Sequence, residues 1–533
     1  MNERKKIFLL LLTSGILTGI SVAFSKYLGF LEWISLIPLV LALNKLRCLE
    51  NLKLRHAYLY GLFYFECFYA VCFHWFIYLY PLDFTGLNNF YSVIVIILAC
   101  FGLSFLQALF GGLVFLIYVL VSRLTLPKKF PIINLISLPV IYSFYEFTQT
   151  LGWWGVPWGR LSLGQVDMLL PVEAASLFGS YFITAVIVLV NSLLAFALTE
   201  MRDGNRSKKY ALTALTVFVA NMALGSVLML MGERAVGEDS ITVGVVQGNY
   251  DSTEKWTSSP QSMLDKHLDL TRGAASDGAE LVIWAETALP FGLHPKSIYS
   301  IQISEVAREY GITVLVGAMS YDDGEEYNAV FCYNPDGTVD ETLYKKRHLV
   351  PFGEYVPMRS FIETVVPFMS KISMLDEDMT PGTDSEIFDT DIGKVGSLIC
   401  FDSIYEMLSR DSVRDGAELI AISTNDSWFS DSAGIYMHNN QARLRAIENG
   451  RYVARSANTG ISCFISSTGE ILSELPPLTE GYLCEEVYLS GRTTLYKIIG
   501  NTFVYLLGTT ILVPFAYEAF LEIKRKNANK CKQ

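Results

Sequence analysis

The sequence predicts a membrane protein in two parts, a polytopic bundle of about eight apolar helices and a layered α/β domain. Of its 533 residues, 51% are hydrophobic and 18% are charged, but the two kinds are unevenly distributed. Residues 1–232 are almost continuously apolar, whereas residues 240–490 have the mixed composition of a globular domain. A last apolar stretch covers residues 496–520. We therefore expect seven transmembrane helices, a globular domain and a C-terminal transmembrane helix.

Eight apolar stretches approach or exceed the length of roughly 20 residues that a helix needs to cross a bilayer. They cover residues 7–24, 27–43, 57–79, 91–121, 132–145, 172–198, 210–231 and 496–520. The first follows Lys5 and Lys6, as the apolar part of a signal peptide does. Because no small-residue cleavage site follows it, we expect a retained helix.

The basic residues predict the orientation of these spans, because Lys and Arg concentrate in cytoplasmic loops. With eight spans, the basic segments all fall on one side of the membrane. Both termini are then cytoplasmic and the globular domain is extracytoplasmic. One span more or fewer among the first seven would reverse this orientation. The segments are residues 4–6, 45–55, 123–129, 202–209 and 524–526.

Charge and metal-binding residue types exclude several classes of function. The net charge of −12 offers no basic surface of the kind that nucleic acid needs. The nine cysteines and six histidines show no metal-ligand spacing, so we expect neither a metal nor another cofactor. A disulfide that involves Cys400 stays open at this point.

The globular part alternates strand-like and helix-like segments. A hairpin joins residues 329–333 to residues 338–344 through Asn334-Pro335-Asp336-Gly337, whose Pro and Gly suit a type I turn. Alternating strands and helices with added hairpins indicate a layered α/β domain. Further strands are expected at residues 241–246, 281–285, 313–317, 396–399, 419–423 and 461–466, and helices at 263–275, 301–310, after Cys400 and at 438–451.

Three reactive side chains stand at the ends of strand-like runs. Glu286 closes residues 281–285, Lys346 follows residues 341–344, and Cys400 ends residues 395–399. A cysteine nucleophile reacts as thiolate, so it needs a base or a lowered pKa. Acyl transfer also needs a positive charge or a donor where oxyanion charge develops. Glu286 can be the base and Lys346 the charge, although each of the three residues alone also fits a structural role.

The motifs around these three residues favour a catalytic role over a structural one. WAETALP (284–290), YKKRHLVPFGEYVP (344–357) and ICFD (399–402) occur in this order, and VQGN (246–249), NDSWF (425–429) and RSAN (455–458) accompany them. Together they resemble the nitrilase (carbon–nitrogen hydrolase) superfamily and, more closely, the bacterial apolipoprotein N-acyltransferase family. With the eight-span layout, the resemblance covers essentially the whole chain.

The resemblance implies an αββα sandwich with a Glu-Lys-Cys triad. Glu286 would be the general base, Cys400 the nucleophile, and Lys346 the group that stabilises the tetrahedral intermediate. Glu354 would be a supporting carboxylate. The family commonly has Tyr-Glu after the nucleophile, where this chain has Phe401-Asp402. Aromatic side chains that shape a lipid entrance, with plain packing as the alternative, would be Trp256, Trp428 and Phe429.

The resemblance further implies acyl transfer at a bacterial inner membrane. A phospholipid would donate an acyl chain to the cysteine, and the N-terminal amine of S-diacylglyceryl-cysteine in an apolipoprotein would accept it. A second interpretation is a membrane-tethered amidase or nitrilase-type hydrolase with water as acceptor. Its small polar amide substrate would not require the run of N-terminal apolar spans. A third is a non-catalytic membrane scaffold, against which the intact Glu286, Lys346 and Cys400 argue.

Overall fold

The computed structural model describes residues 2–49, 51–82, 88–235, 237, 239–251, 254–365, 378–490 and 492–530. The chain divides into two compact units, which we describe separately. The first contains Met1–His74, Ile97–Leu228 and Ile499–Gln533, and the second contains Trp75–Ile96 and Met229–Ile498.

The first unit is helical. Three short elements, α2 (Ser25–Leu28), η1 (Gly29–Leu31) and α3 (Glu32–Ser35), interrupt the second apolar stretch before α4 begins. The other apolar elements are α1 (Glu3–Ala23), α4 (Ile37–Arg47), α5 (Leu54–Cys72), η2 (His74–Leu79), α6 (Asn89–Arg123), α7 (Thr125–Lys129), α8 (Ile132–Thr148), η4 (Leu161–Met168), α9 (Ala175–Phe178), α10 (Ser180–Thr199), α11 (Gly204–Arg234), α18 (Leu495–Ile499), α19 (Thr502–Thr510) and α20 (Leu512–Lys530), of which η2, α6, α11 and α18 are shared with the second unit.

Within the described residues, six helical segments are long and apolar enough to cross a membrane. The stretches expected at residues 57–79 and 132–145 are also largely helical, but they are not among the six. Helix α5 ends at Cys72 and includes Arg55, His56 and Glu66, which lower its hydropathy, while α8 has only 17 residues. The count of eight spans is therefore not confirmed. The six segments are Glu3–Ala23, Ser25–Arg47, Asn89–Arg123, Ser180–Thr199, Gly204–Arg234 and Thr502–Asn527.

Small and polar residues hold the helices of the first unit together. A Cβ atom on Gly15 would lie 2.9 Å from Cβ of Cys67, so glycine permits the close approach of α1 to α5. The buried carboxylate of Glu146 in α8 accepts hydrogen bonds from the backbone N–H of Leu161 at 2.9 Å and from the hydroxyl of Thr184 at 2.5 Å. Such bonds compensate the burial of a polar side chain among apolar helices.

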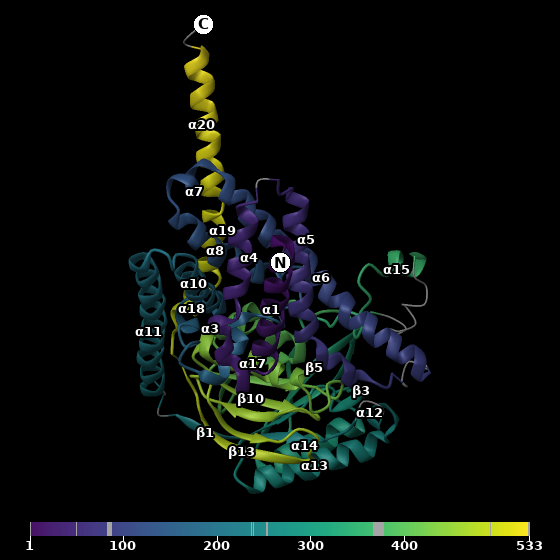
Figure 1. Cartoon of the computed structure of the whole chain (residues 1–533). Coiled ribbons are helices and arrows are strands. Elements are labelled where there is room, and N and C mark those ends of the chain that lie inside the picture. The colour runs from purple at the N-terminus through teal and green to yellow at the C-terminus, as the bar shows by residue number, and fades with distance from the viewer. Residues whose placement is uncertain are drawn as a thin grey trace. The chain divides into compact units, whose positions relative to one another are not determined.

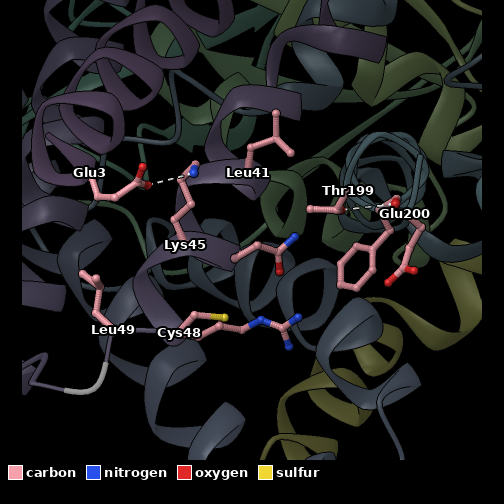
Figure 2. Close-up of a pocket in the computed structure, with 10 residues that line it drawn as sticks. Glu3, Leu41, Lys45, Cys48, Leu49, Thr199 and Glu200 are labelled. Atoms are coloured by element: carbon pink, nitrogen blue, oxygen red, sulfur yellow. Dashed lines mark hydrogen bonds and ion pairs between the residues drawn. The ribbon is translucent and has the colours of Figure 1, made fainter. Parts of the chain in front are cut away.

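A cavity of about 500 Å³ lies in the first unit near the start of α1 and the ends of α4 and α10 (Figure 2). Its lining mixes acidic and basic side chains, and Glu3 is paired with Lys45 there at 2.9 Å. None of the three predicted reactive residues lines it.

Among the described residues, the strands of the second unit form two sheets (Figure 1). The first sheet has the order β13-β1-β2-β4-β5-β6 with β3 beside β4, and the second has the order β12-β11-β10-β9-β8-β7. Neighbours β1, β2 and β4 are parallel, as are β8, β9 and β10. The strands are β1 (Ser240–Gln247), β2 (Leu281–Trp284), β3 (Leu289–Gly292), β4 (Thr313–Asp322), β5 (Glu325–Tyr333), β6 (Val339–Lys345), β7 (Ile387–Thr390), β8 (Gly393–Ile399), β9 (Leu419–Thr424), β10 (Tyr452–Ala457), β11 (Ser462–Ile465), β12 (Ile471–Leu475) and β13 (Gly481–Tyr488).

Apolar cores join these sheets and helices into four layers. Between the sheets, Val245 and Leu315 of the first share a buried cluster with Ile399 and Leu419 of the second. On the outer face of the first sheet, residues of α13 and α14 pack against β2 and β4. On the outer face of the second sheet, α16 and α17 pack against β8 and β9. The αββα sandwich is thereby confirmed. The helices of this unit are α12 (Glu254–Thr257), α13 (Pro260–Ser276), α14 (Ile298–Tyr310), α15 (Arg359–Val365), η5 (Cys400–Ile404), α16 (Glu406–Arg414) and α17 (Ala433–Asn449).

The expected strands and helices of this domain are present, and the turn at residues 334–337 is closed by a 2.8 Å bond from Gly337 N to Asn334 O. Helix α17 begins five residues before the expected start at His438, and Gly450 ends it in the left-handed conformation. Strands β3, β7, β10, β12 and β13 were not predicted. In β10 every residue is buried, so the sequence lacks the alternation of a half-exposed strand.

Candidate active site

Cys400 stands at a sharp turn from strand to helix. Strand β8 ends at Ile399, and Cys400 begins η5 with a φ of +49°, a left-handed conformation that is unfavourable for a residue with a side chain. The hydroxyl of Ser403 donates to the carbonyl oxygen of Cys400 at 2.7 Å, which supports the turn. Cys400 is a partly buried free thiol and forms no disulfide with another cysteine of the described residues. Strained backbone of this kind is concentrated at functional sites.

Glu286 and Lys346 meet at the ends of strands of the first sheet. Glu286 follows β2 and Lys346 follows β6, and both side chains are buried. The ammonium of Lys346 lies 2.8 Å from Oε1 of Glu286 and 2.9 Å from Oε1 of Glu354. One cation thus pairs with two carboxylates. Electrostatic interactions with Glu286 and Lys346 act on the thiol of Cys400, so the structure brings the three predicted residues together.

A side chain that the sequence did not identify completes this arrangement. The amide of Asn328 in β5 donates at 2.8 Å to Glu286 and at 2.8 Å to Glu354, the same two oxygens that Lys346 contacts. The other oxygen of Glu354 accepts from the backbone N–H of Val350 at 2.8 Å. Glu354 is therefore held from two sides, which fits a residue that orients Lys346.

The electrostatics of the site favour a protonated thiol and an ionised base at rest. Burial raises the pKa of the Cys400 thiol well above its usual range, and the charge of Glu286 adds to this, while Lys346 opposes it. Burial also raises the pKa of Glu286, but the charge and hydrogen bond of Lys346 outweigh it and lower the pKa overall. Lys346 is therefore placed to stabilise negative charge that forms at Cys400.

Asp402 connects the turn of Cys400 to the segment that carries Lys346. Its carboxylate accepts from the Tyr344 hydroxyl at 2.8 Å, the backbone N–H of His348 at 2.7 Å and that of Ile399 at 3.1 Å. Burial raises the pKa of Asp402 to about 6, although these bonds oppose the shift. The shorter carboxylate at this position thus still reaches three donors.

Phe401 packs among rings. Its ring centroid lies 5.9 Å from that of His348 and 5.5 Å from that of Tyr405, and the side chain is buried.

Phe429 contacts Trp75 edge to face, with 4.7 Å between the ring centroids, and its centroid lies 6.4 Å from that of His438. Trp428 is half-buried on the same loop. The side chain of Trp256 lies outside the described residues, so the lipid-entrance role stays a prediction for all three aromatics.

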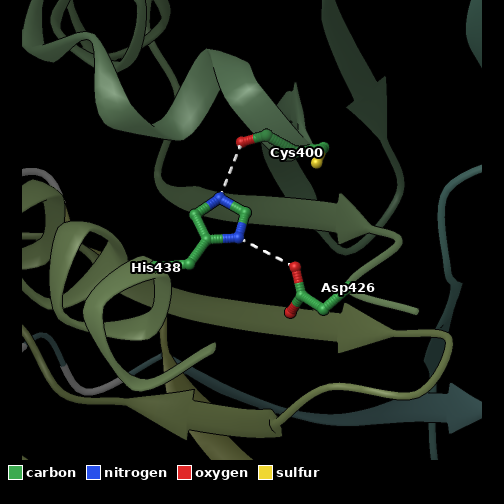
Figure 3. A group of neighbouring side chains, drawn as sticks. All are labelled: Cys400, Asp426 and His438. Atoms are coloured by element: carbon green, nitrogen blue, oxygen red, sulfur yellow. Dashed lines mark hydrogen bonds and ion pairs between the residues drawn. The ribbon is translucent and has the colours of Figure 1, made fainter. Parts of the chain in front are cut away.

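A polar network lies behind Cys400 (Figure 3). His438 in α17 contacts Asp426 through Nδ1 at 2.8 Å, and its Nε2 lies 3.3 Å from the carbonyl oxygen of Cys400. Arg455 in β10 donates to the other oxygen of Asp426 at 2.7 Å. Asp426 and Arg455 lie in the motifs NDSWF and RSAN, but the sequence gave no indication that His438 joins them.

Within the described part of the chain, the ligand atoms of Cys400, Asp426 and His438 form a group close enough to hold a metal ion, all lying within 4.8 Å. Their existing partners argue against that role. Arg455 already neutralises Asp426, and the ring nitrogen facing the nucleophile is directed at its carbonyl oxygen rather than its sulfur (Figure 3). The group is better described as support for the turn of Cys400.

Lys255 is a further charged side chain that the sequence did not identify. It lies in α12 with 1% of its surface exposed, and its ammonium donates to the carbonyl oxygen of Glu286 at 2.9 Å. A lysine beside Trp256 in the sequence gave no indication of this burial.

Family models match both parts of this chain. A family model described as carbon-nitrogen hydrolase matches residues 242–496, and one described as apolipoprotein N-acyltransferase N-terminal domain matches residues 14–193. An apolipoprotein N-acyltransferase of Geobacter metallireducens is 32% identical over 396 residues, which are 72% of this chain and 74% of the relative. One of Borreliella burgdorferi is 26% identical over 549 residues and covers 98% of both chains. The solved structure of Saccharomyces cerevisiae Nit3, of branch 10 of the nitrilase superfamily, is 20% identical with a TM-score of 0.38 and covers 49% of this chain and 93% of its own.

Proposed function

The chain belongs to the apolipoprotein N-acyltransferase family, and from that premise we propose that Cys400 carries an acyl group as a thioester between two lipid substrates. The protein is an acyltransferase of lipoprotein N-acylation. The donor in this proposal is a membrane phospholipid. The acceptor is the N-terminal amine of S-diacylglyceryl-cysteine in an apolipoprotein.

In the first step, Sγ of Cys400 attacks the carbonyl carbon of a phospholipid ester while Glu286 takes the thiol proton. The tetrahedral intermediate carries its negative charge on the former carbonyl oxygen, where the ammonium of Lys346 stabilises it. The carbon–oxygen ester bond then breaks, and Glu286 returns the proton to the departing lysophospholipid oxygen. The acyl group remains on Cys400 as a thioester.

In the second step, the amine of the apolipoprotein attacks the thioester carbonyl. Glu286 takes a proton from the amine, the carbon–sulfur bond breaks, and Cys400 recovers a proton as the amide forms. A thioester is reactive enough to acylate an amine, provided that water is kept out. The apolar helices of the first unit bring the chain to the bilayer in which both substrates reside.

The single observation that carries this proposal is the pairing of Lys346 with both Glu286 and Glu354, beside a cysteine at a strained turn. One paired cation keeps the base ionised and also offers positive charge to the intermediate. The match of residues 242–496 to carbon-nitrogen hydrolase supports a second candidate, transfer of the acyl group to water. The two candidates share the triad and differ in the acceptor.

The decisive experiment is mass spectrometry of the full-length protein after incubation with phospholipids of defined acyl chains. We expect one acyl mass on the peptide that contains Cys400, and its loss when an S-diacylglyceryl peptide is added. Cys400→Ala should form no adduct, whereas Cys484→Ala, which removes a partly buried thiol in β13, should behave like the wild type. Normal N-acylation by Cys400→Ala, in cells that lack the wild-type protein, would refute the proposal. Release of free fatty acid without transfer would favour the hydrolase.

A further inference from the structure

Lys255 is an ammonium buried beside the catalytic base. It projects from α12, and Nζ donates to the main-chain oxygen of Glu286 at 2.9 Å and to the hydroxyl of Thr287 at 2.6 Å. Burying an ammonium is unfavourable unless hydrogen bonds and opposite charge compensate it. Glu286 and Thr287 supply the hydrogen-bond acceptors, and the carboxylate of Glu286 supplies the opposite charge. This indicates that Lys255 acts on the segment that carries Glu286.

The backbone at this point is strained. Thr287 has a φ of +44°, so the residue directly after the base adopts the left-handed conformation. Lys255 contacts both sides of this linkage, the carbonyl of Glu286 and the side chain of Thr287. A group that bonds both residues holds the strained peptide, and with it the direction in which the Glu286 carboxylate points.

The excess of negative charge at the site favours a second cation beside Lys346. Glu286 and Glu354 are two carboxylates, and Lys346 supplies one positive charge against them. Lys255 interacts electrostatically with Glu286 and with Cys400, so its charge favours the ionised form of both. Among the described residues, His267 in α13 also interacts electrostatically with Lys255. Burial, with the charge of Lys255 as a smaller contribution, lowers the pKa of His267 to about 4. His267 is therefore neutral near pH 7 and does not repel the ammonium.

We propose that Lys255 is a positioning residue for the base: it holds the Glu286 peptide and supplies a second positive charge that favours the anionic states formed at Cys400. This inference rests on the triad assigned under the proposed function. Burial lowers the pKa of Lys255 to about 8. The charge is therefore present below that pH and is lost above it.

The test is the rate at which iodoacetamide alkylates Cys400 in the full-length protein, measured by mass spectrometry of its peptide from pH 6 to pH 10. Lys255→Met should lower the rate at pH 7 roughly tenfold, and its difference from the wild type should shrink as the pH rises above about 8, where Lys255 loses its charge. Lys255→Arg should recover most of the lost rate. The control Lys266→Met removes a more exposed lysine of α13, which pairs with Glu480, and should leave the profile unchanged.

An unchanged pH profile in folded Lys255→Met would overturn the proposal. A folded Lys255→Arg as impaired as Lys255→Met would overturn its electrostatic part. If Lys255→Met does not fold, Thr287→Val keeps the lysine and removes one acceptor, and it should lower the rate at pH 7 by a smaller factor. An unchanged rate would again count against the role. Alkylation needs no lipid, so it tests the role of Lys255 even if the wild type forms no acyl adduct. The absence of an acyl adduct would refute the proposed function and leave the role of Lys255 to be decided by the alkylation rates.

Discussion

The ammonium of Lys346 lies 2.8 Å from the carboxylate of Glu286, and both side chains are buried. Removing one partner of a buried ion pair leaves the other charge uncompensated, which typically costs about 3–5 kcal/mol. In the proposed mechanism the same pair also performs two chemical tasks, proton transfer and stabilisation of an oxyanion. Substitutions here therefore affect stability and rate together.

Glu286→Gln should nearly abolish formation of the acyl-enzyme while preserving the shape of the side chain. A glutamine does not accept the thiol proton, and loss of a general base typically lowers the rate by about 10²–10⁴-fold. The check is the initial rate of acyl adduct formation on Cys400, alongside the thermal unfolding midpoint. Glu280→Gln, which changes an exposed carboxylate in contact with the backbone of Thr242, serves as control. A rate within threefold of the wild type would exclude Glu286 as the base.

Asn328→Asp should inactivate the protein more severely than Asn328→Ser. The amide of Asn328 donates to both Glu286 and Glu354, so a carboxylate there would place a third negative charge against one ammonium. We expect the pKa of Glu286 to rise as a result, and acyl adduct formation at pH 7 to fall by more than tenfold. If the rate recovers below pH 6, when the new acid is protonated, repulsion is the cause. Equal activity of the two variants would contradict this explanation.

Asp402→Ala should destabilise the second unit and slow acyl transfer. The change leaves the Tyr344 hydroxyl and the backbone N–H groups of His348 and Ile399 without this acceptor. Each unsatisfied buried group costs about 1–3 kcal/mol, so the unfolding midpoint should drop clearly. Phe401→Tyr, the adjacent change toward the residue common in the family, should leave the midpoint nearly unchanged. A stable and fully active Asp402→Ala would show that the turn does not need this carboxylate.

Acid should destabilise the protein through Asp426. Burial raises the pKa of this carboxyl, but Arg455 and His438 outweigh burial and lower it from 3.8 to about 2. Because the folded-state pKa is the lower one, the stabilisation is present above pH 4 and is lost as the pH falls toward 2. Its size follows from the shift and is about 2 kcal/mol. Thermal midpoints of the wild type and Asp426→Asn should therefore differ most at pH 7 and converge near pH 2. A difference that stays constant with pH would contradict this origin.

The orientation deduced from the basic loops is testable at the C-terminus. With the terminus in the cytoplasm, a fused green fluorescent protein should fluoresce and a fused alkaline phosphatase should be inactive, because each reporter works on one side of the membrane. The opposite pair of results would place the terminus outside. That outcome would mean that the total number of spans is odd or that the basic loops lie outside.

Local patterns in the sequence were enough to predict much of this protein. The strands of the catalytic domain that alternate or run apolar, such as residues 241–246 and 281–285, are present as β1 and β2. The motifs around Glu286, Lys346 and Cys400 were sufficient to identify the family. These features depend on residues that are neighbours in the chain, so they leave a pattern that can be recognised without coordinates.

Only the tertiary structure showed which other side chains complete the site. Asn328 lies 42 residues from Glu286 and 26 from Glu354, and Lys255 lies 31 residues before Glu286, yet all meet around one group of charges. Sheet pairing and burial decide such contacts, and neither is encoded in the spacing of residues along the chain. The same holds for His438 behind Cys400, which reaches the nucleophile from a different helix. The sequence alone identified the three residues proposed as nucleophile, base and cation. The folded structure decided what holds them in position, because burial and hydrogen bonding act between elements that only folding brings together.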